Sequence, residues 1–238
     1  MAANGSAPLP TELVAPQLET LIHLLGAQHE PVRDVVVAGI TVAHSQPTYL
    51  SSFEMPTGGD VSVHRGAAVV MANTSNCTIT DVTFASVGGN GVLISGKNLG
   101  ARVAHSEFVW TGDGAIVILG ETNPICHDFG PEQGGEVCAN LGPDATTDSH
   151  PVGTVIESNL IHELGIYTKQ AAAVLQALAT RTTVRGNVFF NMPRAGIDLI
   201  DGFGGSHVIE GNFGGNTGMW RIVIPTAEPC SVSLATEL

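Results

Sequence analysis

The sequence has no long apolar run and few cations. A helix that crosses a membrane needs about 18 consecutive apolar residues, and stretches such as residues 66–72 (GAAVVMA) are much shorter. Residues 1–20 have neither a basic start nor an apolar stretch, so no secretory signal is visible. Nine Lys and Arg stand against 22 Asp and Glu in 238 residues, which gives a net charge of −13. Because binding to a nucleic-acid backbone requires clustered cations, we expect no nucleic-acid partner.

Charged residues and aromatic residues are also scarce, at 13% and 5% of the chain. The hydrophobic fraction of 43% is enough for a core, so the composition excludes a disordered chain. Ordinary layered cores fill space with large aromatic side chains, whereas this sequence has 29 Gly and many small β-branched residues. A narrow core of stacked Val, Ile and Leu needs few aromatic residues, and this favours a solenoid.

A short pattern recurs along the chain: a β-branched residue, a residue three positions later, and an apolar residue five positions later. Its instances are Val37/Ile40/Val42, Ile79/Val82/Phe84, Val103/Ser106/Phe108, Ile156/Asn159/Ile161, Val184/Asn187/Phe189 and Ile209/Asn212/Phe213. In the last instance the final apolar residue comes one position early. Three of the intervals between first members are 24 to 28 residues, and the other two fit the same unit with an insertion.

A second short strand follows a glycine in several units, as in residues 91–94, 114–118 and 196–200. Units of this length with two or three short strands are typical of the rungs of a parallel β-helix. We therefore predict an all-β solenoid over residues 14–216, with irregular segments at 1–13 and 217–238. Strand alternation then points Ile197 and Leu199 inward and Asp198 outward.

Two further segments bear on the rungs. Asn159, Asn187 and Asn212 share one position of the pattern, and we interpret them as a structural ladder of hydrogen-bonded amides. Residues 170–179 (QAAAVLQALA) have high helix propensity, so a short helix is an alternative to the strand that we expect there.

Two insertions interrupt the pattern at residues 43–65 and 121–150, and both are turn-rich and too polar to pack. Solenoids place such insertions on one face, often the binding face. The second contains six acids and no Lys or Arg, so bound calcium is an alternative to simple solvation of these acids. It also contains Cys126 and Cys138, which would form a disulfide in an exported protein. Cys77, in the rung pattern, is expected to pack as a small apolar residue.

No His or Cys spacing is typical of a metal site, so we expect no metal or other cofactor.

Four segments occur in order along the chain: GGDVSVHRGAAVV (58–70), WTGDGAI (110–116), HELGIYTKQ (162–170) and PRAGIDLIDGFGG (193–205). Through them the sequence resembles the right-handed parallel β-helix proteins of the pectin-lyase-like superfamily, in particular a carbohydrate-active subgroup. The resemblance implies a single-stranded right-handed β-helix, a polysaccharide or oligosaccharide partner, and an extracellular or secretory-pathway location. Relatives usually have Asn in place of Asp198 and continue with further rungs beyond Asn216, so we expect this chain to be a fragment.

Carboxylates supply the candidate chemistry. Equivalent positions on adjacent rungs lie ~4.8 Å apart, close to the ~5 Å of a retaining glycosidase pair, and more distant rungs suit the ~6.5–9.5 Å of an inverting pair. We expect Asp201, in Asp-Gly-Phe-Gly-Gly, to act as general acid or base, with Asp198 or Asp113 as its partner. Glu163 is a further candidate. The alternative for Asp201 and Asp113 is capping of their own turns, and for Glu163 simple exposure to solvent.

The scarce cations and two histidines are candidate substrate-binding residues: Arg194, Lys169, Arg65, His162 and His64. A lyase acting on uronic acids needs a base and a cation that neutralises the sugar carboxylate. Arg194 could serve that purpose, or it could pair internally with Asp198. His64 and Arg65, at the end of an insertion, could reach over the same face.

The sequence therefore predicts a polysaccharide-active protein that cleaves glycosidic bonds by hydrolysis or β-elimination. Its cleft would run along an outward strand face and be roofed by both insertions. The alternatives are a non-catalytic glycan-binding or structural β-helix, and an inactive truncated product.

Overall fold

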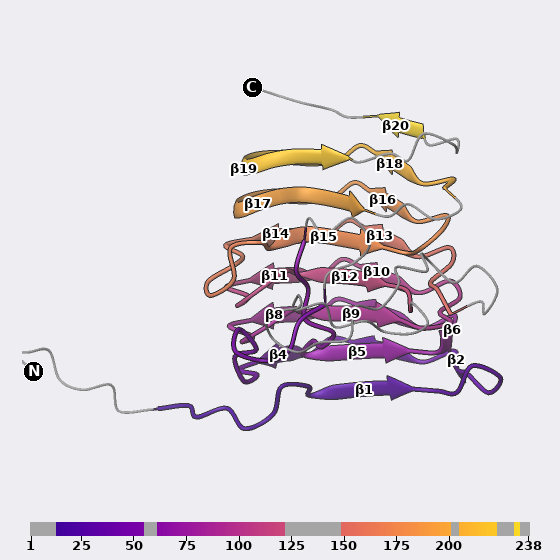
Figure 1. Cartoon of the computed structure of the whole chain (residues 1–238), viewed down its shortest axis with the longest axis horizontal. Helices are drawn as coiled ribbons and strands as arrows, with labels where there is room; N and C mark the ends of the chain where they lie inside the picture. The colour runs from indigo at the N-terminus through magenta and orange to yellow at the C-terminus, as the bar shows by residue number, and fades with distance from the viewer. Residues whose placement is uncertain (1–12, 55–60, 122–148, 201–204, 223–230, 234–238) are drawn as a thin grey trace, which may run out of the picture.

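The computed structural model describes residues 13–54, 61–121, 149–200, 205–222 and 231–233, with side chains up to residue 216. Every regular element in these ranges is a β-strand. The strands wind in rungs that stack along one axis, from β1 at one end to β19 and β20 at the other (Figure 1). All strand pairs between rungs are parallel, as the sequence pattern predicts.

The rungs present three faces. The first face consists of β3 (Val36–Ala38), β7 (Thr78–Thr80), β10 (Arg102–Ala104), β13 (Val155–Glu157), β16 (Thr183–Arg185), β18 (Val208–Glu210) and β20 (Ser231–Ser233). The second consists of β4 (Thr41–Ala43), β8 (Thr83–Ala85), β11 (Glu107–Val109), β14 (Leu160–His162) and the first parts of β17 (Val188–Ile200) and β19 (Phe213–Ile222). The third consists of β1 (Ile22–Leu25), β5 (Val69–Ala72), β9 (Val92–Ser95), β12 (Ile116–Leu119), β15 (Ala172–Ala177) and the later parts of β17 and β19. The short β2 (Val32–Arg33) and β6 (Thr74–Ser75) pair at a corner.

Most apolar residues of the sequence repeat form the core, where each of them lies beside its equivalent on the next rung. The first members of the repeat align in register on the first face, from Val37 through Ile79, Val103, Ile156 and Val184 to Ile209. On the second face the rings of Phe84 and Phe108 stack with centroids 4.4 Å apart. Because β15 is a buried strand, residues 170–179 follow the strand prediction and not the helical alternative.

One member of the repeat departs from the core. Phe213 pairs with Val188, so Gly214 and not Phe213 lies beside the buried Phe189. Phe213 consequently faces outward and is 47% exposed. The strand register is kept although it leaves an apolar side chain in solvent.

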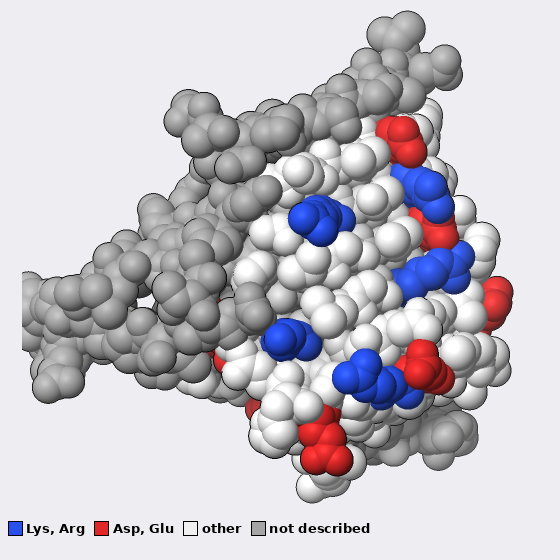
Figure 2. All heavy atoms as spheres, turned by 90° about the vertical axis from the view of Figure 1, so that its right-hand side faces the viewer, with Lys and Arg blue, Asp and Glu red and all other residues white. Residues whose placement is uncertain are grey.

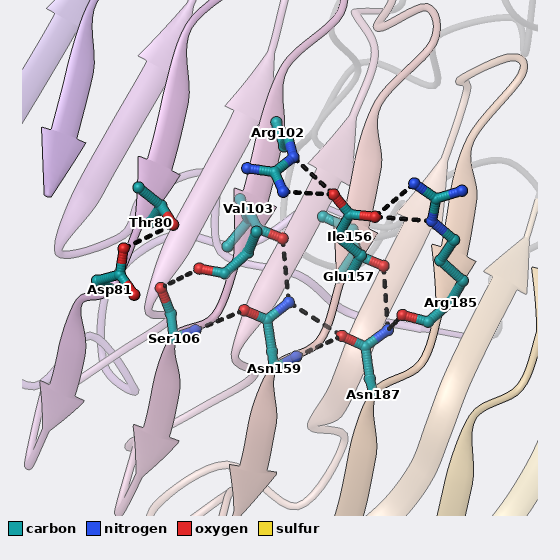
Figure 3. A network of polar contacts seen from close by, with 11 residues as sticks. Thr80, Asp81, Arg102, Val103, Ser106, Ile156, Glu157, Asn159, Arg185 and Asn187 are labelled. Atoms are coloured by element: carbon teal, nitrogen blue, oxygen red, sulfur yellow. Dashed lines mark hydrogen bonds and ion pairs between the residues drawn. The ribbon is translucent and has the colours of Figure 1, made fainter.

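The predicted asparagine ladder is confirmed, and Figure 3 shows its step from Asn159 to Asn187. Asn159 Nδ2 donates to Asn187 Oδ1 at 3.0 Å, and Asn187 Nδ2 donates to Asn212 Oδ1 at 2.9 Å. Each of these amides also donates to a backbone carbonyl of the first face, at 2.8 to 3.0 Å. The three side chains are buried, so the ladder satisfies backbone groups that would otherwise lose their hydrogen bonds to water.

The turn residue that directly follows each second-face strand, here called the second corner, has left-handed backbone geometry. The six residues at the second corner are His44, Ser86, Trp110, Glu163, Asn191 and Asn216, with φ between 47° and 59°. This conformation is least costly for Gly and Asn and is unfavourable for a bulky side chain. Trp110 is therefore the residue that fits this backbone least well.

The outward side of the third face is apolar. Val70, Leu93, Val117 and Leu175 lie in register across it and are buried. Val61 of the first insertion joins the same cluster and is 1% exposed. The expectation that the first insertion is too polar to pack is therefore wrong for residues 61–63, whose two valines alternate with a polar residue. The expectation of a cleft along this outward face is also wrong there, because a second apolar layer fills the space.

The parallel pairing extends past residue 216. β19 follows β17 as far as Ile222, and β20 pairs with β18. The prediction of an irregular segment at 217–238 is therefore wrong for residues 217–222 and 231–233.

No helix in the described ranges is long and apolar enough to cross a membrane. Cys77 is fully buried as predicted, whereas Cys126, Cys138 and most of the 121–150 insertion lie outside the described residues.

Acid should destabilise the rung that contains His207. This side chain is 4% exposed and lies 3.2 Å from Gln176 Nε2, and burial lowers its pKa below the ordinary value of 6.5. Below pH 6.5 the unfolded chain then binds a proton that the folded chain does not, so the free energy of unfolding falls as the pH decreases. We expect His207→Gln to lose less stability than the wild type between about pH 7.5 and 5.5 in urea denaturation. Equal losses would contradict this.

Candidate functional site

A groove with a volume of about 340 Å³ lies beside the second corner. Trp110 and Tyr167 line it together with the corner residues His44 and Ser86. Both aromatic side chains are about half exposed, and the ring of Tyr49 lies 5.5 Å from that of Tyr167. The chain has only two Trp and two Tyr, so three of these four residues meet at one place on the surface. Exposed aromatic clusters of this kind mark binding surfaces.

Hydrogen bonds hold the two sides of the groove together. The backbone amides of Ile166 and Tyr167 donate to the carbonyls of Thr111 and Gly112, at 3.0 Å each. Lys169 Nζ closes the same loop by donating to the Gly165 carbonyl at 2.5 Å. Lys169, predicted to bind substrate, thus fixes the loop that presents Tyr167.

Gly112 is required by the close approach of its neighbours. A Cβ atom at this position would lie 2.0 Å from the carbonyl oxygen of Gly88 and 2.9 Å from Tyr167 Cδ2. These distances are well below van der Waals contact. The absence of a side chain therefore allows the loop of Tyr167 to pack directly on the segment that begins with Trp110.

Asp113 follows in the same segment and is 8% exposed. Burial raises the pKa of its carboxyl from 3.8 to about 6, against the smaller lowering effects of the Gly114 amide and the charge of His64. The carboxyl therefore retains its proton up to about pH 6, well above the range of an exposed aspartic acid, as suits a general acid. The amide of Gly165 donates to the Asp113 carbonyl, so the segment is tied to the Tyr167 loop on this side too.

His64 supplies a basic nitrogen near this acid. Its Nδ1 lies 2.7 Å from the carbonyl oxygen of Ser52, and a carbonyl can only accept, so Nδ1 carries the proton in the neutral ring. Nε2 then has a free lone pair and lies 3.8 Å from Glu19 Oε2. The ring packs over Gly66, where a Cβ atom would lie 2.5 Å from Nε2.

Asn90 links the two groups. Its Nδ2 donates to the carbonyls of His64 and Gly66, at 3.1 and 3.0 Å, and its Oδ1 accepts from the Gly114 amide at 3.1 Å. The side chain is 1% exposed, so these bonds are made without competition from water. Asn90 therefore fixes the backbone of His64 relative to that of Asp113.

The other predicted carboxylates are arranged differently. Asp198 is fully buried, and Arg194 Nε lies 3.5 Å from its Oδ2, which confirms the internal pair. Asp198 pairs with Leu175, which in turn pairs with Val117, so Asp198 lies two rungs away from Val117. Asp113 precedes Val117 by four residues, which adds roughly 13 Å along the strand direction to its separation from Asp198. These two acids do not form a glycosidase pair. Asp201 lies outside the described residues.

Glu163 and His162 lie on the rung after Trp110, on the outer side. Glu163 Oε1 accepts a hydrogen bond from Asn191 Nδ2 at 2.6 Å. His162 Nε2 is 3.1 Å from Glu107 Oε1, and its ring stacks on Phe190 with centroids 4.8 Å apart. Both side chains thus make contacts between rungs, and neither is among the described residues that line the groove.

Arg65 has a structural environment. Its guanidinium group binds both carboxylate oxygens of Glu54 and donates to Ser95 Oγ at 2.6 Å and to the Gly120 carbonyl at 3.0 Å. Because these contacts use both the Nε and terminal N–H groups, Arg65 holds the first insertion against the third face. No group of three or more metal-ligating side chains occurs in the described part of the chain.

Five residues of this site were not predicted from the sequence: Tyr49, Trp110, Tyr167, Glu19 and Asn90. The scarcity of Tyr and Trp was a usable signal, because a residue type that the core does not need is more often functional when present. Nothing in the repeat pattern distinguishes Glu19 or Asn90.

Comparison with known proteins identifies the architecture. The family described as the right-handed β-helix region matches residues 61–213. A solved chain described as a glycoside hydrolase has a TM-score of 0.64 and 18% identity, and the match covers 79% of this chain and 34% of that one. PfbA, a surface adhesin of Streptococcus pneumoniae, has a TM-score of 0.48 and 16% identity, with 84% and 46% covered. At these identities the likeness concerns the fold, and no curated protein matches.

Proposed function

The chain belongs to the right-handed β-helix family, and from this premise we propose that it cleaves glycosidic bonds of a polysaccharide or oligosaccharide bound at the groove of Trp110 and Tyr167. The observation that carries the proposal is Asp113, a carboxyl group with a pKa of about 6 in the segment that also presents Trp110. This chain spans about a third of the length of its glycoside-hydrolase neighbour, so the neighbour supports the proposal only through its fold.

The groove suits a sugar ring. The ring faces of Tyr and Trp are apolar and carry partial negative charge, while the Tyr O–H and Trp N–H groups at the ring edge can bond to water. The axial C–H groups of a pyranose form an apolar face that can stack on such a ring, and its hydroxyl groups remain in water. Tyr49, Trp110 and Tyr167 offer three such rings, of which the two tyrosines lie 33° from parallel.

Asp113 and His64 supply the proton transfers that hydrolysis needs. The carboxyl of Asp113 donates its proton to the glycosidic oxygen, and the electron pair of the bond to the anomeric carbon passes to that oxygen. Water adds its oxygen to the anomeric carbon, and its proton passes to His64 Nε2. Asn90 keeps the donor and the acceptor in place, and Glu19 stabilises the imidazolium that forms.

The direct test is the release of new reducing ends from a panel of polysaccharides by the folded protein. A second candidate function is glycan binding without cleavage, which the exposed aromatic groove alone favours. Binding without new reducing ends would establish that second function and exclude cleavage.

Trp110→Asn should weaken oligosaccharide binding without destabilising the fold. Asn occupies the second corner at Asn191 and Asn216 and tolerates the left-handed backbone, so we expect the variant to be at least as stable as the wild type. Loss of the indole should weaken oligosaccharide binding about tenfold, which corresponds to about 1.4 kcal/mol. Calorimetric titration and thermal unfolding measure the two effects.

The matched control is Leu99→Asn, which removes a 40% exposed apolar side chain at another corner. It should leave the affinity unchanged. Equal affinities of Trp110→Asn and the wild type would show that the groove does not bind the sugar.

A further inference from the structure

We propose that the groove selects neutral sugars, which it cleaves by hydrolysis, and that it neither binds uronic acids well nor catalyses their β-elimination. This inference rests on the proposed function and specifies its substrate class. It follows from the distribution of charge around the groove and from the contacts that nearby cations make.

The groove itself lacks basic side chains other than histidine. Among the described residues that line it there is no Lys or Arg, and its polar groups are hydroxyl and imidazole groups such as those of Ser45 and His44. A uronate carboxylate would therefore lose hydration on binding without gaining an ionic partner. Such an exchange is unfavourable unless a cation compensates for it.

The cations that the sequence offers for this purpose are engaged elsewhere. Lys169 Nζ donates to the carbonyls of Gly165 and Ile166, at 2.5 and 3.4 Å, and Arg65 binds the carboxylate of Glu54. Arg194 is paired with the fully buried Asp198. Recruiting any of them to a substrate would break an existing charge-assisted contact.

Two further arginines are paired on the first face, away from the groove. There Glu157 is clamped by Arg102 and Arg185, with N–O distances of 2.5 and 2.6 Å (Figure 3). The hydrogen bond from Arg185, together with the bonds and charge of Arg102, holds the pKa of this carboxyl below its usual value. On the side of the molecule shown in Figure 2, basic side chains are isolated or lie against acidic ones, with no continuous basic patch on the described surface.

The groups near the groove instead have the opposite sign. Asp113 directly follows Gly112, on which Tyr167 packs, and Glu19 follows Leu18, whose carbonyl accepts a hydrogen bond from the Gln46 amide beside the groove. The net charge of −13 adds a long-range repulsion against a polyanionic chain. Neutral glycans experience neither penalty, and the aromatic rings bind their C–H faces as well as those of uronates.

The chemistry agrees with this selection. In β-elimination a base removes the proton next to the sugar carboxylate, a carbon–carbon double bond forms, and the glycosidic oxygen leaves with its electron pair. That step needs a cation on the carboxylate to stabilise the developing negative charge. Hydrolysis needs only water, a proton donor and a proton acceptor, which Asp113 and His64 provide.

The experiment compares hexasaccharides of neutral glucose, xylose, mannose or galactose units with hexagalacturonate and hexamannuronate. Affinity is measured by calorimetry, and products are measured both as reducing ends and as unsaturated-uronate absorbance. We expect at least one neutral series to bind at least tenfold more tightly than either uronate, and to yield reducing ends without ultraviolet absorbance. Tighter binding of a uronate, or an unsaturated product, would overturn the neutral-sugar inference and leave cleavage of glycosidic bonds intact.

A charge insertion provides the second arm. Ile166 lines the groove and is 46% exposed, so Ile166→Lys adds a cation to a described lining that has no Lys or Arg. Uronate affinity should rise at least fivefold in this variant, and the same substitution at Val36, exposed on the first face, should have no effect. No gain in Ile166→Lys would contradict the inference. If folded wild-type protein neither binds nor cleaves any member of the panel, the proposed function fails and the inference fails with it.

Discussion

Asp113→Asn is expected to lower the rate of glycosidic cleavage by about 10²- to 10⁴-fold, the usual contribution of a general acid. The same substitution should stabilise the fold at pH 7. Burial raises the pKa of this carboxyl to about 6, so at pH 7 the folded protein carries a buried charge that the environment disfavours. The shift from 3.8 to about 6 corresponds to at most about 3 kcal/mol, and we expect a gain of about 1–3 kcal/mol.

The sign can be checked with pH. Between pH 3.8 and 6 the folded state binds more protons than the unfolded state, so this group stabilises the wild type increasingly as the pH falls through that window. The amide that replaces the carboxyl cannot titrate, so the difference in free energy of unfolding between Asp113→Asn and the wild type should shrink toward about pH 4. The control is Asp81→Asn, at an exposed corner, which should retain activity. An inactive Asp113→Asn protein that is also less stable at pH 7 would indicate a structural role.

Asn187→Ala is expected to lower the free energy of unfolding by about 2–4 kcal/mol. Asn187 Oδ1 accepts from the backbone amide and Nδ2 of Asn159, and its Nδ2 donates to the Ile156 carbonyl and to Asn212. Alanine leaves these buried partners unsatisfied, at a cost of about 1–3 kcal/mol for each group that finds no water. The loss should spread to both neighbouring rungs because the ladder is continuous.

Urea denaturation measures this effect. The control is Gln17→Ala, which removes an exposed amide whose contact with the Ala15 carbonyl is 3.4 Å long, and it should change stability by less than about 0.5 kcal/mol. A loss of less than about 1 kcal/mol for Asn187→Ala would mean that water replaces the ladder, contrary to its burial.

The rungs were predictable because their determinants are local. Val103, Ser106 and Phe108 reflect a strand, a turn and a strand within six residues, and each later unit repeats them at nearly constant spacing. The same regularity predicted the inward direction of Ile197 and Leu199, which lie in the core, and the stacking of Asn159 on Asn187. Only the register at Phe213 failed, because backbone pairing with Val188 outweighed the burial of one ring.

The groove could not be predicted in this way because its parts come from separate loops. Tyr49, Trp110 and Tyr167 have no periodic relation, and they meet only when rungs stack and the 165–168 loop packs on Gly112. The raised pKa of Asp113 likewise depends on burial, which a sequence does not show for a residue in a turn-like segment. The packing of Val61 was missed because two valines in a polar insertion are too short a pattern to indicate a strand face.

The pH dependence of kcat/KM on a cleaved oligosaccharide tests the central claim most directly. With Asp113 as the general acid, the rate should fall about tenfold per pH unit above a pKa of about 6, and Asp113→Asn should lack this limb in its residual activity. A rate that stays level or rises between about pH 6 and 8 would contradict the assignment of Asp113 as the proton donor of this site.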